Sequence, residues 1–138
     1  MRNLVVSAFT AACFLVPAAL PAQAEPFLHG HEVASALIGN TIEGTYRSCA
    51  SPRKDFYELY KADGTFHGKE RDCAQAGNWS TYVGKWSVEG GKFCVYPGSD
   101  RTSGCFDYEG SGEGKMVRSG SDSDTVEFVI LEGNPENL

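Results

Sequence analysis

The chain has 138 residues, of which 12 are Lys or Arg and 18 are Asp or Glu, so its formal net charge at pH 7 is −6. An acidic chain without a cluster of basic residues lacks the positive surface that nucleic acids and anionic membranes require, so neither is a predicted partner. The length allows one domain with a single hydrophobic core of modest size.

The first 24 residues have the pattern of a secretory signal peptide. A basic start at Arg2 precedes an apolar run from Leu4 to Leu20, and Ala22-Gln23-Ala24 provides small residues at a cleavage site. A transmembrane helix is disfavoured because two prolines interrupt the run, which is also short for crossing a bilayer. We therefore predict cleavage near Ala24 and a periplasmic or secreted protein without a stable membrane anchor. Residues 25–138 would form a single β domain.

Four of the five cysteines lie after this cleavage site, at Cys49, Cys73, Cys94 and Cys105. An even number of cysteines in an exported chain indicates disulfides, and four cysteines allow three connectivities. We favour Cys94–Cys105 together with Cys49–Cys73. A metal site is disfavoured because there is no Cys-x-x-Cys pair and exported thiols are usually oxidised.

The segment between Pro26 and Asn40 predicts a helix of about two turns. Apolar residues recur at helical spacing from Val33 to Ile38, and Gly39-Asn40 is a typical C-terminal stop. The apolar stripe is too small for a helical bundle, so we expect this helix to cover one end of a β-structure.

The strongest short-range hairpin signal is Asp63-Gly64, which separates strand-like runs at 55–62 and 65–70. A two-residue turn there makes Glu58 and Lys69 cross-strand partners, so we expect their face of the sheet to be solvated. The opposite face would then direct three apolar or aromatic side chains inward: Tyr57, Leu59 and Phe66. The solvated face would carry two aromatic side chains: Phe56 and Tyr60.

A three-stranded meander is predicted between Thr81 and Tyr108. A tight turn at Gly90-Gly91 pairs Trp86 with Val95 and Val88 with Phe93. Pairing Cys94 with Cys105 independently places Phe93 opposite Phe106. Because both registers choose the same apolar side, we expect Trp86 and Phe93 to face inward and the two cysteines to lie on the outer face.

Further strands are predicted from Thr41, around Lys115–Arg118, and near the C-terminus, where Val126, Phe128 and Ile130 alternate with less apolar residues. About eight short strands with tight turns and no long helix favour a small antiparallel up-and-down β-barrel of calycin-like shape, with a β-sandwich as the alternative. Closure of the sheet would also hide the strand edges.

The sequence contains no catalytic signature. There is no Gly-x-Ser-x-Gly motif, and the three histidines have no evident nucleophile beside them. His29-x-His31 is a weak metal-binding pattern in a segment better explained as a solvated arm. We therefore predict a non-enzymatic protein without a metal or a cofactor.

The aromatic residues suggest a binding function. A closed barrel of this size can hold one small ligand, so we predict that an apolar or aromatic ligand contacts Tyr57, Trp86 and Phe93 in the interior. The alternative is a protein-interaction module, such as an inhibitor of a hydrolase or an envelope or virulence-associated factor. Such a module would present the outward aromatic side chains to an envelope protein.

Five short motifs resemble a family of small exported alphaproteobacterial proteins of uncharacterised function. They are Gly39-Asn40-Thr41, Asp63-Gly64-Thr65, Gly84-Lys85-Trp86-Ser87-Val88, the Cys94/Cys105 pair and Gly133-Asn134-Pro135. The resemblance spans nearly the whole mature chain. It implies a bacterial periplasmic or secreted location and no particular activity.

The chain is also loosely similar to lipocalins. Its Gly-x-Trp motif, however, lies in mid-chain at Gly84–Trp86, whereas the first strand has Gly44-Thr45-Tyr46, and the final strand has no Arg. The resemblance is therefore compatible with a calycin-like shape, and it does not extend to the features of a lipocalin-type pocket.

Overall fold

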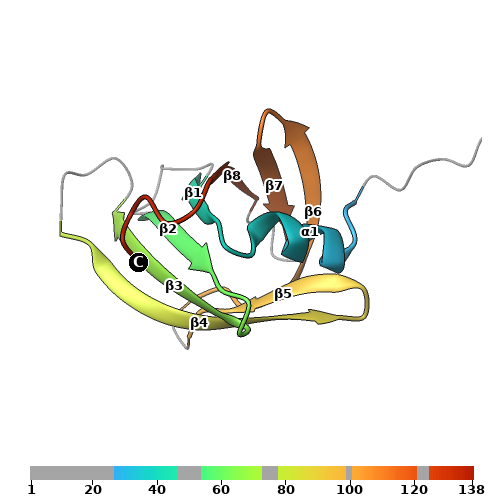
Figure 1. Cartoon of the computed structure of the whole chain (residues 1–138), viewed down its shortest axis with the longest axis horizontal. Coiled ribbons are helices and arrows are strands. Elements are labelled where there is room, and N and C mark those ends of the chain that lie inside the picture. The colour runs from blue at the N-terminus through green and yellow to red at the C-terminus, as the bar shows by residue number, and fades with distance from the viewer. Residues whose placement is uncertain (1–26, 47–53, 73–77, 99–100, 121–124) are drawn as a thin grey trace, which may run out of the picture.

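The computed structural model describes residues 27–46, 54–72, 78–98, 101–120 and 125–138. Each strand pairs antiparallel with the next, and the last strand pairs with the first, so the sheet closes into a barrel (Figure 1). The predicted barrel is confirmed. The elements are α1 (Gly30–Leu37), β1 (Thr41–Tyr46), β2 (Lys54–Tyr60), β3 (Thr65–Asp72), β4 (Ser80–Glu89), β5 (Lys92–Tyr96), β6 (Gly104–Gly112), β7 (Lys115–Ser119) and β8 (Val126–Leu131).

The central meander has the predicted register. Trp86 opposes Val95, and Cys94 opposes Cys105 across β5 and β6. The two sulfurs are bonded at 1.98 Å, so the predicted Cys94–Cys105 disulfide is confirmed. The turn residues Gly90 and Gly91 have φ values of 56° and 80°, a conformation that glycine adopts readily. The signal peptide and the predicted Cys49–Cys73 bond lie outside the described residues.

The register of the β2–β3 hairpin differs from the prediction by one residue. Tyr60 pairs with Phe66, and Glu58 pairs with Gly68. The connection is a three-residue loop in which the Lys61 N–H donates to the Thr65 carbonyl at 2.9 Å and Gly64 has a φ of 85°. A slip of one residue inverts the two faces of a strand, and the predicted orientations on β2 were therefore wrong. Phe56 and Tyr60 face inward, whereas Tyr57 and Leu59 lie on the outer face.

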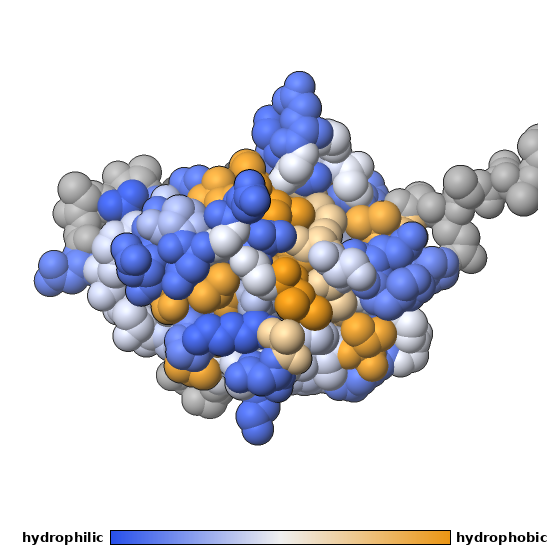
Figure 2. Space-filling model, in the orientation of Figure 1, coloured by the Kyte–Doolittle hydropathy of each residue, from blue (hydrophilic) through white to orange (hydrophobic). Residues whose placement is uncertain are grey.

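Helix α1 covers one end of the barrel, as predicted. Its Val33 and Leu37 side chains are fully buried in the core. Gly30 lies so close to the β4–β5 hairpin that an added Cβ would be 2.7 Å from the Lys92 carbonyl carbon, and the Gly30 N–H donates to the Gly91 carbonyl at 2.7 Å. Apolar residues also gather on the visible surface over α1 (Figure 2).

The two ends of the barrel have different connections. The tight turns at 61–64, 90–91 and 113–114 lie at the end that α1 covers, together with the connection from α1 to β1. Strands β1, β3, β5 and β7 end at the opposite end of the barrel, which we call the mouth, and β2, β4, β6 and β8 begin there. Within the described parts of the chain, no helix combines the length and the apolar character needed to cross a bilayer.

Candidate functional site

Aromatic side chains occupy the centre of the barrel. Tyr60 stacks on Phe66 with their ring centroids 5.0 Å apart, and Phe93 lies 5.7 Å from both Tyr60 and Tyr108. Phe128 continues the chain of rings at 6.2 Å from Tyr108. All five side chains are almost completely buried. This part of the interior is therefore filled by the protein's own side chains.

Interior glycines make room for these rings. Gly44, Gly68 and Gly84 each lie directly across the sheet from an aromatic residue. A Cβ built on any of these glycines would overlap the opposing ring of Phe56, Tyr82 or Phe66. The barrel therefore needs glycine at these three positions, because a ring from the neighbouring strand lies over the glycine backbone.

A carboxylate is buried among the rings. Glu58 is 5% exposed, and its two oxygens accept hydrogen bonds from the hydroxyl groups of Tyr60, at 2.6 Å, and Tyr82, at 2.7 Å. Burial of a carboxylate is costly unless such donors compensate it. Glu58 was predicted to lie on the solvated face, so the sequence did not indicate this arrangement.

A buried arginine shares this region of the interior. Arg118 is 7% exposed, and its guanidinium lies 4.9 Å from the centroid of the Phe106 ring. Burial raises the pKa of Tyr108 to about 12, although Arg118 acts in the opposite direction. Burial, followed by the Glu58 charge, raises the pKa of Tyr60 well above its ordinary value. Both tyrosines therefore remain protonated at neutral pH, and Tyr60 can donate to Glu58.

An ion pair covers the interior near the mouth. The Arg101 guanidinium contacts the Glu70 carboxylate at 2.6 Å and lies 4.2 Å from the centroid of the Tyr82 ring. Glu70 is 4% exposed. The buried carboxylates of Glu58 and Glu70 are thus bonded to tyrosine hydroxyls and to Arg101, respectively, which indicates a role in stabilising the fold.

The structure brings together two of the three predicted ligand-binding residues. Trp86 stacks on Phe93 with ring centroids 5.4 Å apart, and its indole N–H donates to the Lys61 carbonyl at 2.8 Å. Tyr57 does not join them. It lies on the outer face, where its hydroxyl donates to Glu43 at 2.8 Å. The three residues therefore do not form one interior site.

Tyr57 belongs instead to a cluster of aromatic and basic side chains on the outer face of β2, β3 and the start of β4. Its ring centroid lies 5.3 Å from that of Trp79. The Arg71 guanidinium lies 4.5 Å from the Trp79 ring, and the Lys69 ammonium lies 5.2 Å from the Tyr57 ring. Burial, followed by the hydrogen bond to Glu43, raises the pKa of Tyr57 to about 12.

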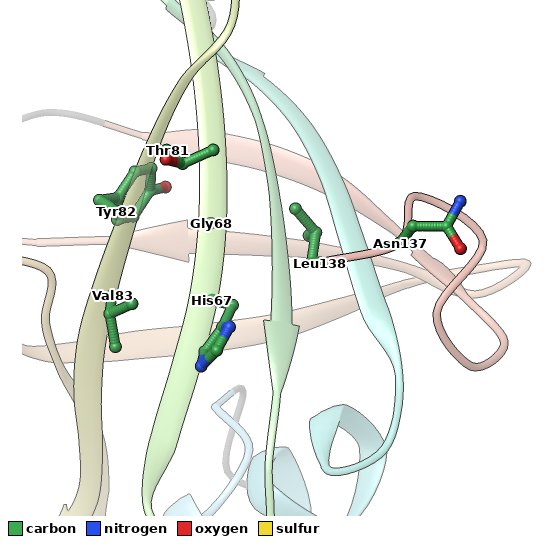
Figure 3. A pocket seen from close by; sticks show the side chains of 7 residues that line it. All are labelled: His67, Gly68, Thr81, Tyr82, Val83, Asn137 and Leu138. Atoms are coloured by element: carbon green, nitrogen blue, oxygen red, sulfur yellow. The ribbon is translucent and has the colours of Figure 1, made fainter.

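A groove of about 350 Å³ lies beside this cluster, between the outer face of β3–β4 and the C-terminal segment (Figure 3). The side chains of His67, Thr81 and Val83 project from the strands, and Leu138 lies near them at the end of the chain. Val83 is 63% exposed, the largest value among the large hydrophobic residues that the structure describes as exposed. The lining comprises His67, Gly68, Thr81, Tyr82, Val83, Asn137 and Leu138.

Specific contacts hold the C-terminal segment, residues 132–138, against the barrel. The Thr41 hydroxyl donates to the Gly133 carbonyl at 2.7 Å, and the Gly133 N–H donates to the Asn40 side chain at 3.0 Å. Further along, the Lys69 ammonium contacts the Glu136 carboxylate at 2.6 Å. The outer wall of the groove is therefore fixed at two places. Sequence periodicity gives no signal for such a wall, because it depends on contacts between opposite ends of the chain.

Among the described residues, Glu89, Cys94 and Cys105 form a group with potential metal ligands within 4.8 Å of one another. The two sulfurs are joined in a disulfide and do not act as thiolate ligands. His29 and His31 lie at the start of α1 with stacked rings 5.8 Å apart, whereas His67 lies on β3 in the groove.

Comparison with known protein families, curated proteins and solved structures gives no match for this chain. The resemblance to small exported alphaproteobacterial proteins stays a prediction.

Proposed function

We propose that this is a non-enzymatic, exported binding protein that holds a small ligand in the groove between β3–β4 and the C-terminal segment. The observation that carries the proposal is the groove itself. Its volume of about 350 Å³ lies within the range of small-molecule sites, and it combines apolar and polar side chains. The packed rings of Tyr60, Phe93 and Phe128 argue against the interior as the binding site.

The chemistry of the groove supports binding without catalysis. Its lining contains a histidine and a threonine, the residue types that a base and a nucleophile would need. However, the Lys61 ammonium lies 3.1 Å from Nε2 of His67. An ammonium can only donate, so Nε2 is the acceptor in this contact, and the ring tautomer that fits it carries its proton on Nδ1. No ring nitrogen is then free to accept a proton from Thr81.

The disulfide supports the location outside the cytoplasm. Cys94 and Cys105 are bonded, which is compatible with an oxidising compartment. In this proposal, the signal peptide predicted at residues 1–24 directs export of the protein.

Two exposed valines on the same strand provide a matched test of the groove. Val83 lines it, whereas Val88, 43% exposed, does not. We expect native mass spectrometry of the protein purified from its producing cells to show a bound small molecule. That mass should be lost in Val83→Trp, which fills the groove, and retained in Val88→Trp. A ligand that Val83→Trp retains and Phe93→Leu loses would place binding in the interior and contradict the proposal.

One observation favours a protein partner as a second candidate. The cluster of Tyr57, Trp79 and Arg71 next to the groove contains the residue types most enriched at protein interfaces. A photoreactive p-benzoylphenylalanine at position 79 or 83 separates the candidates. Cross-linking in the producing cells to one protein of defined mass at both positions would favour the protein partner. A small mass added only at position 83 supports the groove ligand.

A further inference from the structure

We infer that the groove selects small amphipathic anions, such as monocarboxylates with a short apolar tail, and that the Lys61–His67 pair binds their anionic end. This inference rests on the proposed function and names its ligand class. Three features of the groove carry it: the direction of the donors, the placement of the nearby carboxylates and the position of the apolar residues.

The first feature is the polarity of the Lys61–His67 contact. With Nε2 of His67 accepting from Lys61 at 3.1 Å, Nδ1 of the ring carries its proton and acts as a donor. The Lys61 ammonium, which contacts the other ring nitrogen, places a positive charge near that donor. A hydrogen bond from such a group to a carboxylate is stronger than one to a neutral acceptor.

The second feature is the absence of carboxylate side chains from the described groove lining, in a chain with 18 acidic residues. Of the other polar side chains of the lining, Thr81 and Asn137 can donate hydrogen bonds to a ligand, whereas the Tyr82 hydroxyl donates to Glu58 at 2.7 Å. The nearest acidic residue along the C-terminal segment, Glu136, is paired with Lys69 at 2.6 Å. The lining also includes the terminal carboxylate of Leu138, one oxygen of which accepts from the Asn134 side chain at 3.0 Å within its own turn.

The third feature is an apolar side of the groove. Val83 and Leu138 line the groove together with the donors His67 and Thr81. Val83 is 63% exposed. An exposed apolar side chain next to converging donors fits a ligand with a charged head and a short hydrocarbon tail. The volume of about 350 Å³ limits that tail to a small size.

Matched six-carbon probes test the charge preference. We expect NMR titration of the full-length mature protein with hexanoate to shift the amide signals of Gly68, Thr81 and Val83. Hexanamide should bind about fivefold more weakly, the effect of one charge-assisted hydrogen bond at a partly exposed site. Hexylammonium should bind more weakly still, and acetate, which lacks the tail, should also bind more weakly than hexanoate.

Substitution of one lysine assigns the effect to the Lys61–His67 pair. Lys61→Met keeps the backbone carbonyl to which Trp86 donates, so the fold should persist. It should weaken hexanoate binding about fivefold and leave hexanamide binding unchanged. Lys115→Met, at an exposed lysine on β7, serves as the control and should change neither affinity.

The outcomes separate the ligand class from the proposed function. Equal affinities for hexanoate and hexanamide at the groove amides would overturn the ligand class while supporting groove binding. Hexanoate shifts centred on Phe93 and Phe128 would overturn both. No shift with any probe would overturn the ligand class, and the native mass spectra would still test the groove.

Discussion

The inner and outer faces of the sheet around β2 use similar side chains to different effect. On the inner face, the Glu58 carboxylate is 5% exposed and accepts hydrogen bonds from two tyrosines among closely packed rings. On the outer face, Glu43 also accepts from a tyrosine, Tyr57, but this pair is exposed to solvent. On the inner face, Glu58 and its tyrosine donors are bonded to one another and stabilise the barrel. The outer face, where the groove lies, presents hydrogen-bond donors and exposed apolar surface, and the proposed ligand would bind there.

The largest difference between the two faces is expected from truncating aromatic side chains on β5. Phe93 is 1% exposed at the centre of the ring cluster, whereas Tyr96 is 39% exposed. Phe93→Ala should lower the free energy of unfolding by about 3–5 kcal/mol, because it leaves a cavity between packed rings. Tyr96→Ala should lower it by less than about 1 kcal/mol. Urea denaturation measures both, and similar losses would show that the interior is not tightly packed.

A smaller contrast is expected between two buried tyrosines. Tyr60→Phe removes a donor from the buried Glu58 carboxylate and should cost about 1.5–3 kcal/mol. The Tyr108 hydroxyl is buried, makes no hydrogen bond of good geometry among the described residues, and lies close enough to the Arg118 guanidinium for it to lower the pKa of Tyr108. Tyr108→Phe should therefore change the free energy of unfolding by less than about 0.5 kcal/mol at pH 7. Chemical denaturation of both variants tests this, and a larger loss for Tyr108→Phe would reverse the assignment.

The buried tyrosines also predict a loss of stability at alkaline pH. The pKa of Tyr108 is about 12 in the folded protein against an ordinary value of 10.0. Between these values the unfolded chain loses the phenolic proton and the folded chain keeps it, so stability falls as pH rises. The slope should approach about 1.4 kcal/mol per pH unit for this residue. Denaturation between pH 9 and 12 should show a shallower decline in Tyr108→Phe, and identical curves would contradict this contribution.

The smallest effect concerns the loop that decides which residues of β2 face inward. Hydrogen bonds from the Thr65 hydroxyl and N–H lower the pKa of Asp63. Its contribution to stability is therefore present above the unfolded pKa and is lost as pH falls through the lower folded value. Asp63→Asn retains an acceptor but cannot ionise. It should reduce the loss of stability below about pH 4, measured by denaturation from pH 2 to 6, whereas an unchanged profile would contradict this role.

The hairpins differ in how many sequence features constrain their register. For β4–β6, a Gly-Gly turn and a cysteine pair independently specified the same register, and the structure has that register. For β2–β3, Asp63-Gly64 was the main signal, and it suits both two-residue and three-residue loops. The choice of the shorter loop inverted the faces and misplaced Tyr57.

Two features of the molecule exceed what periodicity can predict. The pairing of Gly44, Gly68 and Gly84 with rings on neighbouring strands could have corrected the register, but glycine carries no hydrophobic signal. The groove depends on the C-terminal segment reaching Thr41, a contact between residues 92 positions apart. Sequence patterns describe each strand locally and do not place such a segment.

The central claim is that the aromatic interior is filled by folding and that ligands bind outside it. Xenon enters dry apolar cavities independently of ligand chemistry, so a crystal structure determined under xenon pressure tests this claim most directly. We expect no xenon among Tyr60, Phe93 and Phe128, whose side chains are in mutual contact and almost completely buried. A xenon atom bound between these rings would reveal an interior cavity and contradict the account.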